Sequence, residues 1–147
     1  MLYIYIGNME KVQKIVKILI VGLLLLISIM TNAQSRLGFS EQEIRSEFSD
    51  ETFYSGRTED GTKYIYKFGG HTVAFYYFDE DNVTYMCSVM PKESGALNYL
   101  VEHYNKTAVI VDNYNWKSYG VDNHLTYISL REVNNKLVFI YTVRPLE

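Results

Sequence analysis

The stretch that decides the fold is residues 62–90, TKYIYKFGGHTVAFYYFDEDNVTYMCSVM. It contains three runs rich in aromatic and β-branched residues, and two short polar segments separate them, Gly69-Gly70 and residues 79–82. Runs of this composition and length between turn residues are typical of antiparallel strands joined by hairpins. The stretch therefore predicts a three-stranded meander, with strands over residues 62–68, 72–78 and 83–90.

Helices are predicted before and after this meander. Ser40 is followed three residues later by Glu43, which is the pattern of a capping box at a helix start. This pattern predicts a short helix over residues 41–49. A second helix is predicted over residues 93–105, where apolar residues recur at helical spacing.

The second half of the chain repeats this order of elements. A short apolar run, residues 108–111, and a polar aromatic stretch, residues 112–119, follow the second helix. Two clear strands then cover residues 125–131 and 136–143, with Asn134-Asn135 at the hairpin turn between them. The predicted order is therefore helix–strand–strand–strand, twice.

Two interpretations of this repeated order remain open. A shift of 53 residues aligns Tyr66 with Tyr119 and His71 with His124, as an internal duplication would. The alternative is convergence, because an αβββ unit is a simple way to cover an antiparallel sheet with a helix. Both interpretations predict an α+β fold in which two αβββ units form one antiparallel sheet with the helices on one face.

The first 33 residues have the three parts of a secretory signal peptide. Three lysines precede a twelve-residue, almost wholly apolar run, residues 18–29, and the small residues Thr31 and Ala33 follow it. This run is shorter than the about 20 apolar residues that a membrane span needs. We expect cleavage after Ala33, and Met9 offers an alternative start that gives a signal peptide of ordinary length.

Residues 34–147 then form a single exported α+β domain, periplasmic or secreted, with no stable membrane span after cleavage. This part has 11 basic and 16 acidic residues and a formal net charge of −5. A negative balance argues against nucleic-acid binding, which needs a surface that neutralises phosphates. Cys87 is the only cysteine, so no internal disulfide forms, and its place in a predicted strand indicates a buried, unreactive thiol.

Aromatic residues are unusually frequent in the expected domain, with twelve tyrosines, seven phenylalanines and one tryptophan. Side chains alternate between the two faces of a strand. We expect Phe75 and Ile128 on the face beneath the helices, and Tyr76 and Tyr127 on the open face. The same composition has an ordinary explanation, because tyrosine is a good strand residue that packs its ring and leaves its hydroxyl in water.

The favoured function is a non-catalytic binding domain without a cofactor, whose partner is a protein, a peptide or a glycan of the cell envelope. Tyrosine and tryptophan dominate binding hot spots because they bury a large area at low entropic cost. Trp116 lies in the polar aromatic stretch and is the best single anchor candidate, although the ordinary interpretation of such a residue is a buried tryptophan that closes the core. The candidate binding residues are Tyr76, Tyr114, Trp116, Tyr119 and Tyr127.

An enzyme is the less favoured alternative. The chain has no GxSxG, GxGxxG, HExxH or P-loop motif, so the common nucleophile, dinucleotide, zinc and phosphate sites have no signature in it. His71 and His124 begin corresponding predicted strands, and a pseudo-twofold arrangement would bring them together. A small metal-dependent or hydrolytic enzyme would use these two histidines.

Overall fold

The structure is a computed structural model, and it describes residues 35–120 and 124–146. The predicted signal peptide, residues 1–33, lies outside this range, so the prediction of cleavage after Ala33 stays a prediction. The described residues form two helices and one antiparallel sheet of eight strands. The predicted α+β class and the antiparallel sheet are therefore confirmed.

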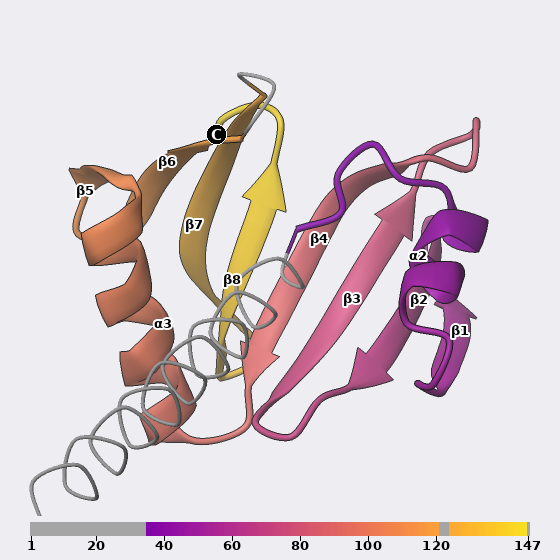
Figure 1. Cartoon of the computed structure of the whole chain (residues 1–147), viewed down its shortest axis with the longest axis horizontal. Helices are drawn as coiled ribbons and strands as arrows, with labels where there is room; N and C mark the ends of the chain where they lie inside the picture. Colours follow the sequence, from indigo (N-terminus) through magenta and orange to yellow (C-terminus); the bar gives the residue numbers. More distant parts are fainter. Residues whose placement is uncertain (1–34, 121–123, 147) are drawn as a thin grey trace, which may run out of the picture. The chain divides into compact units, whose positions relative to one another are not determined.

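Each helix is followed by four strands rather than three. Figure 1 shows α2 over one half of the sheet and α3 over the other. The first half contains α2 (Glu41–Glu47), β1 (Phe53–Arg57), β2 (Lys63–Phe68), β3 (Thr72–Phe78) and β4 (Thr84–Pro91). The second half contains α3 (Ser94–Thr107), β5 (Val109–Asp112), β6 (Asn115–Tyr119), β7 (Leu125–Val133) and β8 (Lys136–Thr142). The predicted three strands per unit were one too few.

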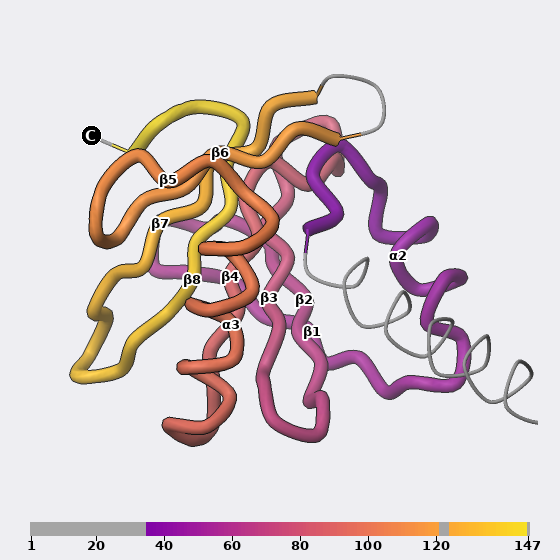
Figure 2. Tube along the Cα trace, turned by 60° about the vertical axis from the view of Figure 1, so that its left-hand side comes forward, coloured from indigo at the N-terminus to yellow at the C-terminus, as the bar shows by residue number. Residues whose placement is uncertain are grey.

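The two halves join at the centre of the sheet. The strand order is β1-β2-β3-β4-β8-β7-β6-β5, and every neighbouring pair is antiparallel. Figure 2 shows the strands of the second half, in orange and yellow, beside those of the first half. Because β4 and β8 meet in the middle, β1 and β5 are the two edges of the sheet.

The capping box at the start of α2 is confirmed. The backbone N–H of Glu43 donates to the Ser40 hydroxyl at 3.3 Å, and the Glu43 carboxylate accepts from the Ser40 backbone N–H at 2.8 Å. Two backbone donors at the helix end are satisfied in this way. This local pattern fixes where α2 begins and places Ile44, which is fully buried, against the sheet.

One row of buried side chains crosses the sheet beneath the helices. Strand register places its six members side by side, and Ile44 of α2 with Leu100 and Tyr104 of α3 completes the core. The row consists of Ile65, Tyr76, Cys87, Tyr141, Ile128 and Trp116. The expected burial of the Cys87 thiol is confirmed, and burial raises its pKa to about 12.

The expected orientation of β3 is wrong. Tyr76 is fully buried in the core row, and Phe75 therefore points to the opposite face of the sheet. The shift of 53 residues pairs Phe75 with Ile128, but Ile128 belongs to the core row. That alignment equates residues on opposite faces in these two strands, and a duplication of αβββ units is not shown.

The strand β5 has an unusually apolar edge. Its first three residues, Val109, Ile110 and Val111, are each more than half exposed. The opposite edge strand, β1, ends in Gly56 and the charged Arg57. The two edges of the sheet are therefore chemically different.

Candidate functional site

Six aromatic side chains lie together on the sheet face opposite to the helices. They come from β1, β2 and β3, and along β2 and β3 they alternate with core residues such as Ile65 and Tyr76. Each of the six has its ring centroid within 6.4 Å of at least one other ring in the set. We call this set the aromatic face: Tyr54, Tyr64, Tyr66, Phe68, Phe75 and Tyr77.

Tyr66 is at the centre of the aromatic face. Its ring centroid lies 5.2 Å from that of Tyr54 and 5.2 Å from that of Phe75, with interplanar angles of 25° and 23°. Phe68 meets Tyr66 edge-on, at 5.6 Å and 79°. Aromatic pairs of these geometries contribute about 0.5–1.5 kcal/mol beyond area burial. The rings therefore hold one another in place before any partner arrives.

A glycine in β1 determines where the Tyr64 ring lies. Gly56 is the cross-strand partner of Tyr64, and a Cβ atom at Gly56 would lie 2.5 Å from the Tyr64 hydroxyl oxygen and 2.6 Å from Cζ. The tyrosine ring thus covers the glycine, an arrangement that compensates for the missing side chain in a strand. Only glycine leaves room for this ring position.

The aromatic face is uncharged and open to solvent. Phe68 is 56% exposed and Tyr54 is 46% exposed, and the other four rings are half-buried. At its border the ammonium group of Lys92 lies 5.5 Å from the centroid of the Phe68 ring. Single exposed aromatic residues are ordinary, but a contiguous apolar patch with a polar border is typical of an interaction surface.

Two of the predicted binding residues lie in the core. Tyr76 is fully buried, and desolvation raises the pKa of its hydroxyl. Trp116 is 2% exposed and packs beside Tyr104 and Phe139, and its Nε1–H donates to Asn105 Oδ1 at 2.9 Å. In this structure neither side chain reaches the surface, and Trp116 takes the core position that the sequence left open.

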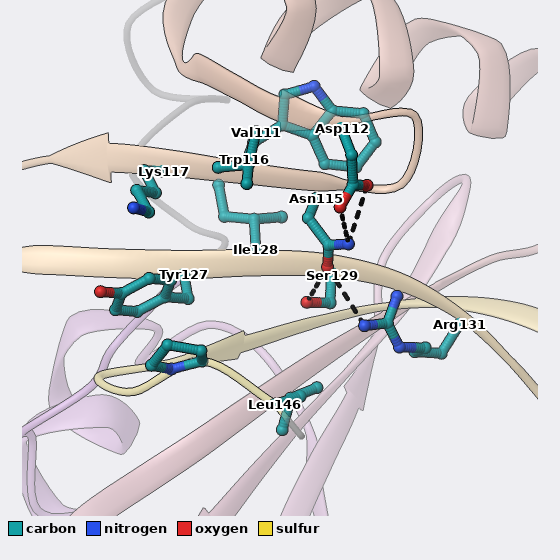
Figure 3. A pocket seen from close by; sticks show the side chains of 11 residues that line it. Val111, Asp112, Asn115, Trp116, Lys117, Tyr127, Ile128, Ser129, Arg131 and Leu146 are labelled. Carbon is teal, nitrogen blue, oxygen red and sulfur yellow. Dashed lines mark hydrogen bonds between the residues drawn. The ribbon is translucent and has the colours of Figure 1, made fainter.

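The other three predicted residues are at the surface but not in the aromatic face. Tyr114 lies in the turn between β5 and β6, and Tyr119 ends β6, both about 60% exposed. Tyr127 is half-buried in β7 and lines a pocket beside β6, where the ammonium of Lys117 lies 5.5 Å from its ring centroid (Figure 3). The structure does not bring the five predicted residues together.

The structure also separates the two histidines of the enzyme hypothesis. His71 precedes β3 and His124 precedes β7, and these strands run antiparallel to each other in the sheet. The residues therefore lie at opposite ends of the sheet, on the order of 30 Å apart along the strands at about 3.4 Å per residue. His71 instead pairs with Glu93, at 2.6 Å from Nδ1 to Oε1. Over residues 35–120 and 124–146, no group of three or more His, Cys, Asp or Glu residues could hold a metal ion.

The fold and this surface define a class: an α+β domain with both helices on one face of an antiparallel sheet and an aromatic surface on the other. None of its described helices is long and apolar enough to cross a membrane. Comparison with protein-family models, curated proteins and solved structures found no match to the chain.

Proposed function

We propose that this chain is an exported, non-catalytic binding domain that holds a protein or peptide partner on its aromatic face. The observation that carries the proposal is the contiguous set of six uncharged rings on the sheet face opposite to the two helices that the structure describes. Export rests on the signal-peptide pattern of residues 1–33.

The packing of the rings reduces the conformational entropy that the aromatic face loses when a partner binds. Tyrosine and phenylalanine have few rotatable bonds, so they lose little conformational entropy when a partner covers them. Tyr66 is already fixed between Tyr54 and Phe75. A surface that is ordered in advance keeps more of its contact energy as affinity.

The orientation of the rings favours a polypeptide over a glycan. The faces of Tyr54, Tyr66 and Phe75 are turned towards one another, so the surface presents ring edges and hydroxyl groups. A sugar ring would need an exposed ring face to lie on. Apolar side chains of a polypeptide can instead pack against ring edges, while its backbone reaches the tyrosine hydroxyls.

Selection from a random peptide library on the immobilised protein, followed by affinity measurements, tests this proposal. Peptides retained by the wild-type protein should bind the Tyr54→Ser/Phe68→Ser variant about tenfold or more weakly, which corresponds to about 1.4 kcal/mol or more. Both side chains are about half exposed but pack against Tyr66, so we expect a folded variant with a lowered melting temperature, and binding is measured well below that temperature.

The matched control is Tyr114→Ser/Tyr119→Ser, which removes two equally exposed tyrosines from outside the aromatic face. This variant should bind the selected peptides like the wild type. The proposal fails if the control loses the affinity and the aromatic-face variant keeps it, or if the wild type retains no peptide. A glycan array on which only the aromatic-face variant loses binding would show that the partner is a glycan.

A further inference from the structure

A pocket of about 280 Å³ lies on the half of the sheet that the aromatic face does not occupy. Residues of β5, β6 and β7 line it, and so do Pro145 and Leu146, which follow β8. Arg131 and Lys117 bring two positive charges to it, and Asp112 brings one negative charge. The pocket thus has a net positive charge and one apolar wall.

Arg131 forms no direct ion pair among the described residues, although its charge interacts at longer range with the carboxylate of Asp112 in the same pocket. Its half-buried guanidinium group donates to two neutral oxygens, the backbone carbonyl of Leu130 and Asn115 Oδ1, each at 3.2 Å. Arg36 and Arg45 form direct ion pairs with glutamates, whereas Arg57 donates to the Gly61 carbonyl. A partly desolvated guanidinium whose direct hydrogen-bond acceptors are neutral favours an incoming anion, and the charge of Asp112 offsets part of this preference.

A chain of hydrogen bonds fixes Arg131 in the pocket. Asn115 Nδ2 donates to both carboxylate oxygens of Asp112 at 2.8 Å, which turns Asn115 Oδ1 towards Ser129 and Arg131 (Figure 3). Ser129 Oγ donates to the same oxygen at 2.7 Å. The backbone N–H of Tyr114, the amide of Asn115 and the positive charge of Arg131 lower the pKa of Asp112, so this carboxylate stays ionised at neutral pH. The guanidinium is therefore positioned before any ligand enters.

The surroundings limit which anion fits. A volume of about 280 Å³ is near the lower limit of small-molecule sites, which begin at about 300 Å³. Tyr127, Leu146 and Val111 add apolar surface to the lining of the pocket. The nearby carboxylate of Asp112 disfavours doubly charged anions such as phosphate more than it disfavours a single carboxylate. A planar carboxylate also matches the donor geometry of a guanidinium.

From this arrangement we infer that the pocket binds a small carboxylate with an apolar body, and that Arg131 is its anion-binding residue. The C-terminal residue of a peptide and a free organic acid share this chemistry. The inference is independent of the aromatic face, because the two sites share no residue.

Three probes test this inference: each is titrated into the purified protein, and binding is measured from the changes in the protein's NMR chemical shifts. The probes are N-acetyl-leucine, its amide and 4-methylpentanoate. N-acetyl-leucine should bind about tenfold or more tightly than its uncharged amide, with a Kd in the range of about 1 mM that is ordinary for a fragment. If 4-methylpentanoate binds as tightly as N-acetyl-leucine, the natural carboxylate is a free organic acid. If it binds more weakly, the carboxylate is the C-terminus of a peptide.

Variants assign the effect to Arg131. Arg131→Gln should weaken N-acetyl-leucine binding about tenfold, Arg131→Lys should weaken it less, and the control Lys136→Gln, an exposed cation on β8, should not change it. The inference is overturned if acid and amide bind equally, if inorganic phosphate binds more tightly than the acid, or if no probe binds at about 10 mM. If Arg131→Gln does not fold, Arg131→Lys together with the acid–amide comparison decides the question.

Discussion

Gly56 is the single residue on which the position of a whole aromatic ring depends. Because a Cβ atom would lie 2.5 Å from the Tyr64 hydroxyl oxygen, we expect Gly56→Ala to lower the free energy of unfolding. The Tyr64 ring must move aside, and its contacts with Tyr66, Phe75 and Tyr77, each worth about 0.5–1.5 kcal/mol, together exceed the about 0.5–1 kcal/mol that alanine gains over glycine in a strand. Urea unfolding of the single variants and of Gly56→Ala/Tyr64→Ala measures both effects. A stabilised Gly56→Ala protein, or additive effects in the double variant, would contradict this interpretation.

Because of Cys87, we expect the core to lose stability at alkaline pH. Desolvation raises the pKa of the thiol from 9.0 to about 12 in the folded protein, so above pH 9 the unfolded chain loses the proton first. The thiol's contribution is fully present below pH 9, and it is lost as pH rises towards 12. We expect the free energy of unfolding to fall by about 1 kcal/mol between about pH 9 and pH 10.

The Cys87→Ala variant is the control for this pH dependence. Its free energy of unfolding should fall less than that of the wild type between about pH 9 and pH 10, measured by urea unfolding at each pH. Tyr76, Tyr104 and Tyr141 also have raised pKa values because they are buried, and they add loss of the same sign at higher pH. Identical slopes in both proteins would show that the thiol does not contribute.

At the scale of the element, local signals predicted structure better than long-range signals did. The capping box of Ser40 and Glu43 identified the start of α2 because both partners lie within one turn. The two edge strands were missed: β1 contains Gly56 and Arg57, and β5 has only four residues. Neither is long or alternating enough for its composition to indicate a strand.

The faces of β3 show why the candidate site could not be located from the sequence. Both alternating sets of this strand are apolar, one with Phe75 and the other with Tyr76, so alternation alone cannot decide which set faces the helices. In the sequence of β2, the aromatic residues Tyr64, Tyr66 and Phe68 alternate with Ile65 and Lys67. Only the register between β2 and β3 brings Phe75 beside Tyr66, and that register is a long-range property.

At the scale of the whole molecule, one hydrophobic core extends across both halves of the sheet. Phe139 is fully buried and packs against Tyr104 and Trp116, while its strand β8 pairs with β4 of the first half. We expect Phe139→Ala to cost about 3–5 kcal/mol and to lower the unfolding midpoint of both halves together. Trp116 fluorescence reports the second half, and far-UV circular dichroism reports the whole chain.

Coincident transitions by these two measurements, in the wild type and in Phe139→Ala, would show that the sheet unfolds as a single cooperative unit. The opposite finding is that Phe139→Ala lowers the midpoint of the Trp116 fluorescence transition, while most of the change in circular dichroism keeps its wild-type midpoint. That outcome would mean that the two halves are separate folding units that merely share a sheet.

The difference between the two edges of the sheet limits how copies of this chain can associate. An apolar edge strand such as β5 is a template for another strand, whereas Gly56 and Arg57 make β1 a poor one. Two copies that pair through β5 would be related by a twofold axis, and each would cover the more receptive of the two edges that the structure describes in the other. Growth through β5 ends at two subunits, so the difference between the edges favours a dimer over a fibre.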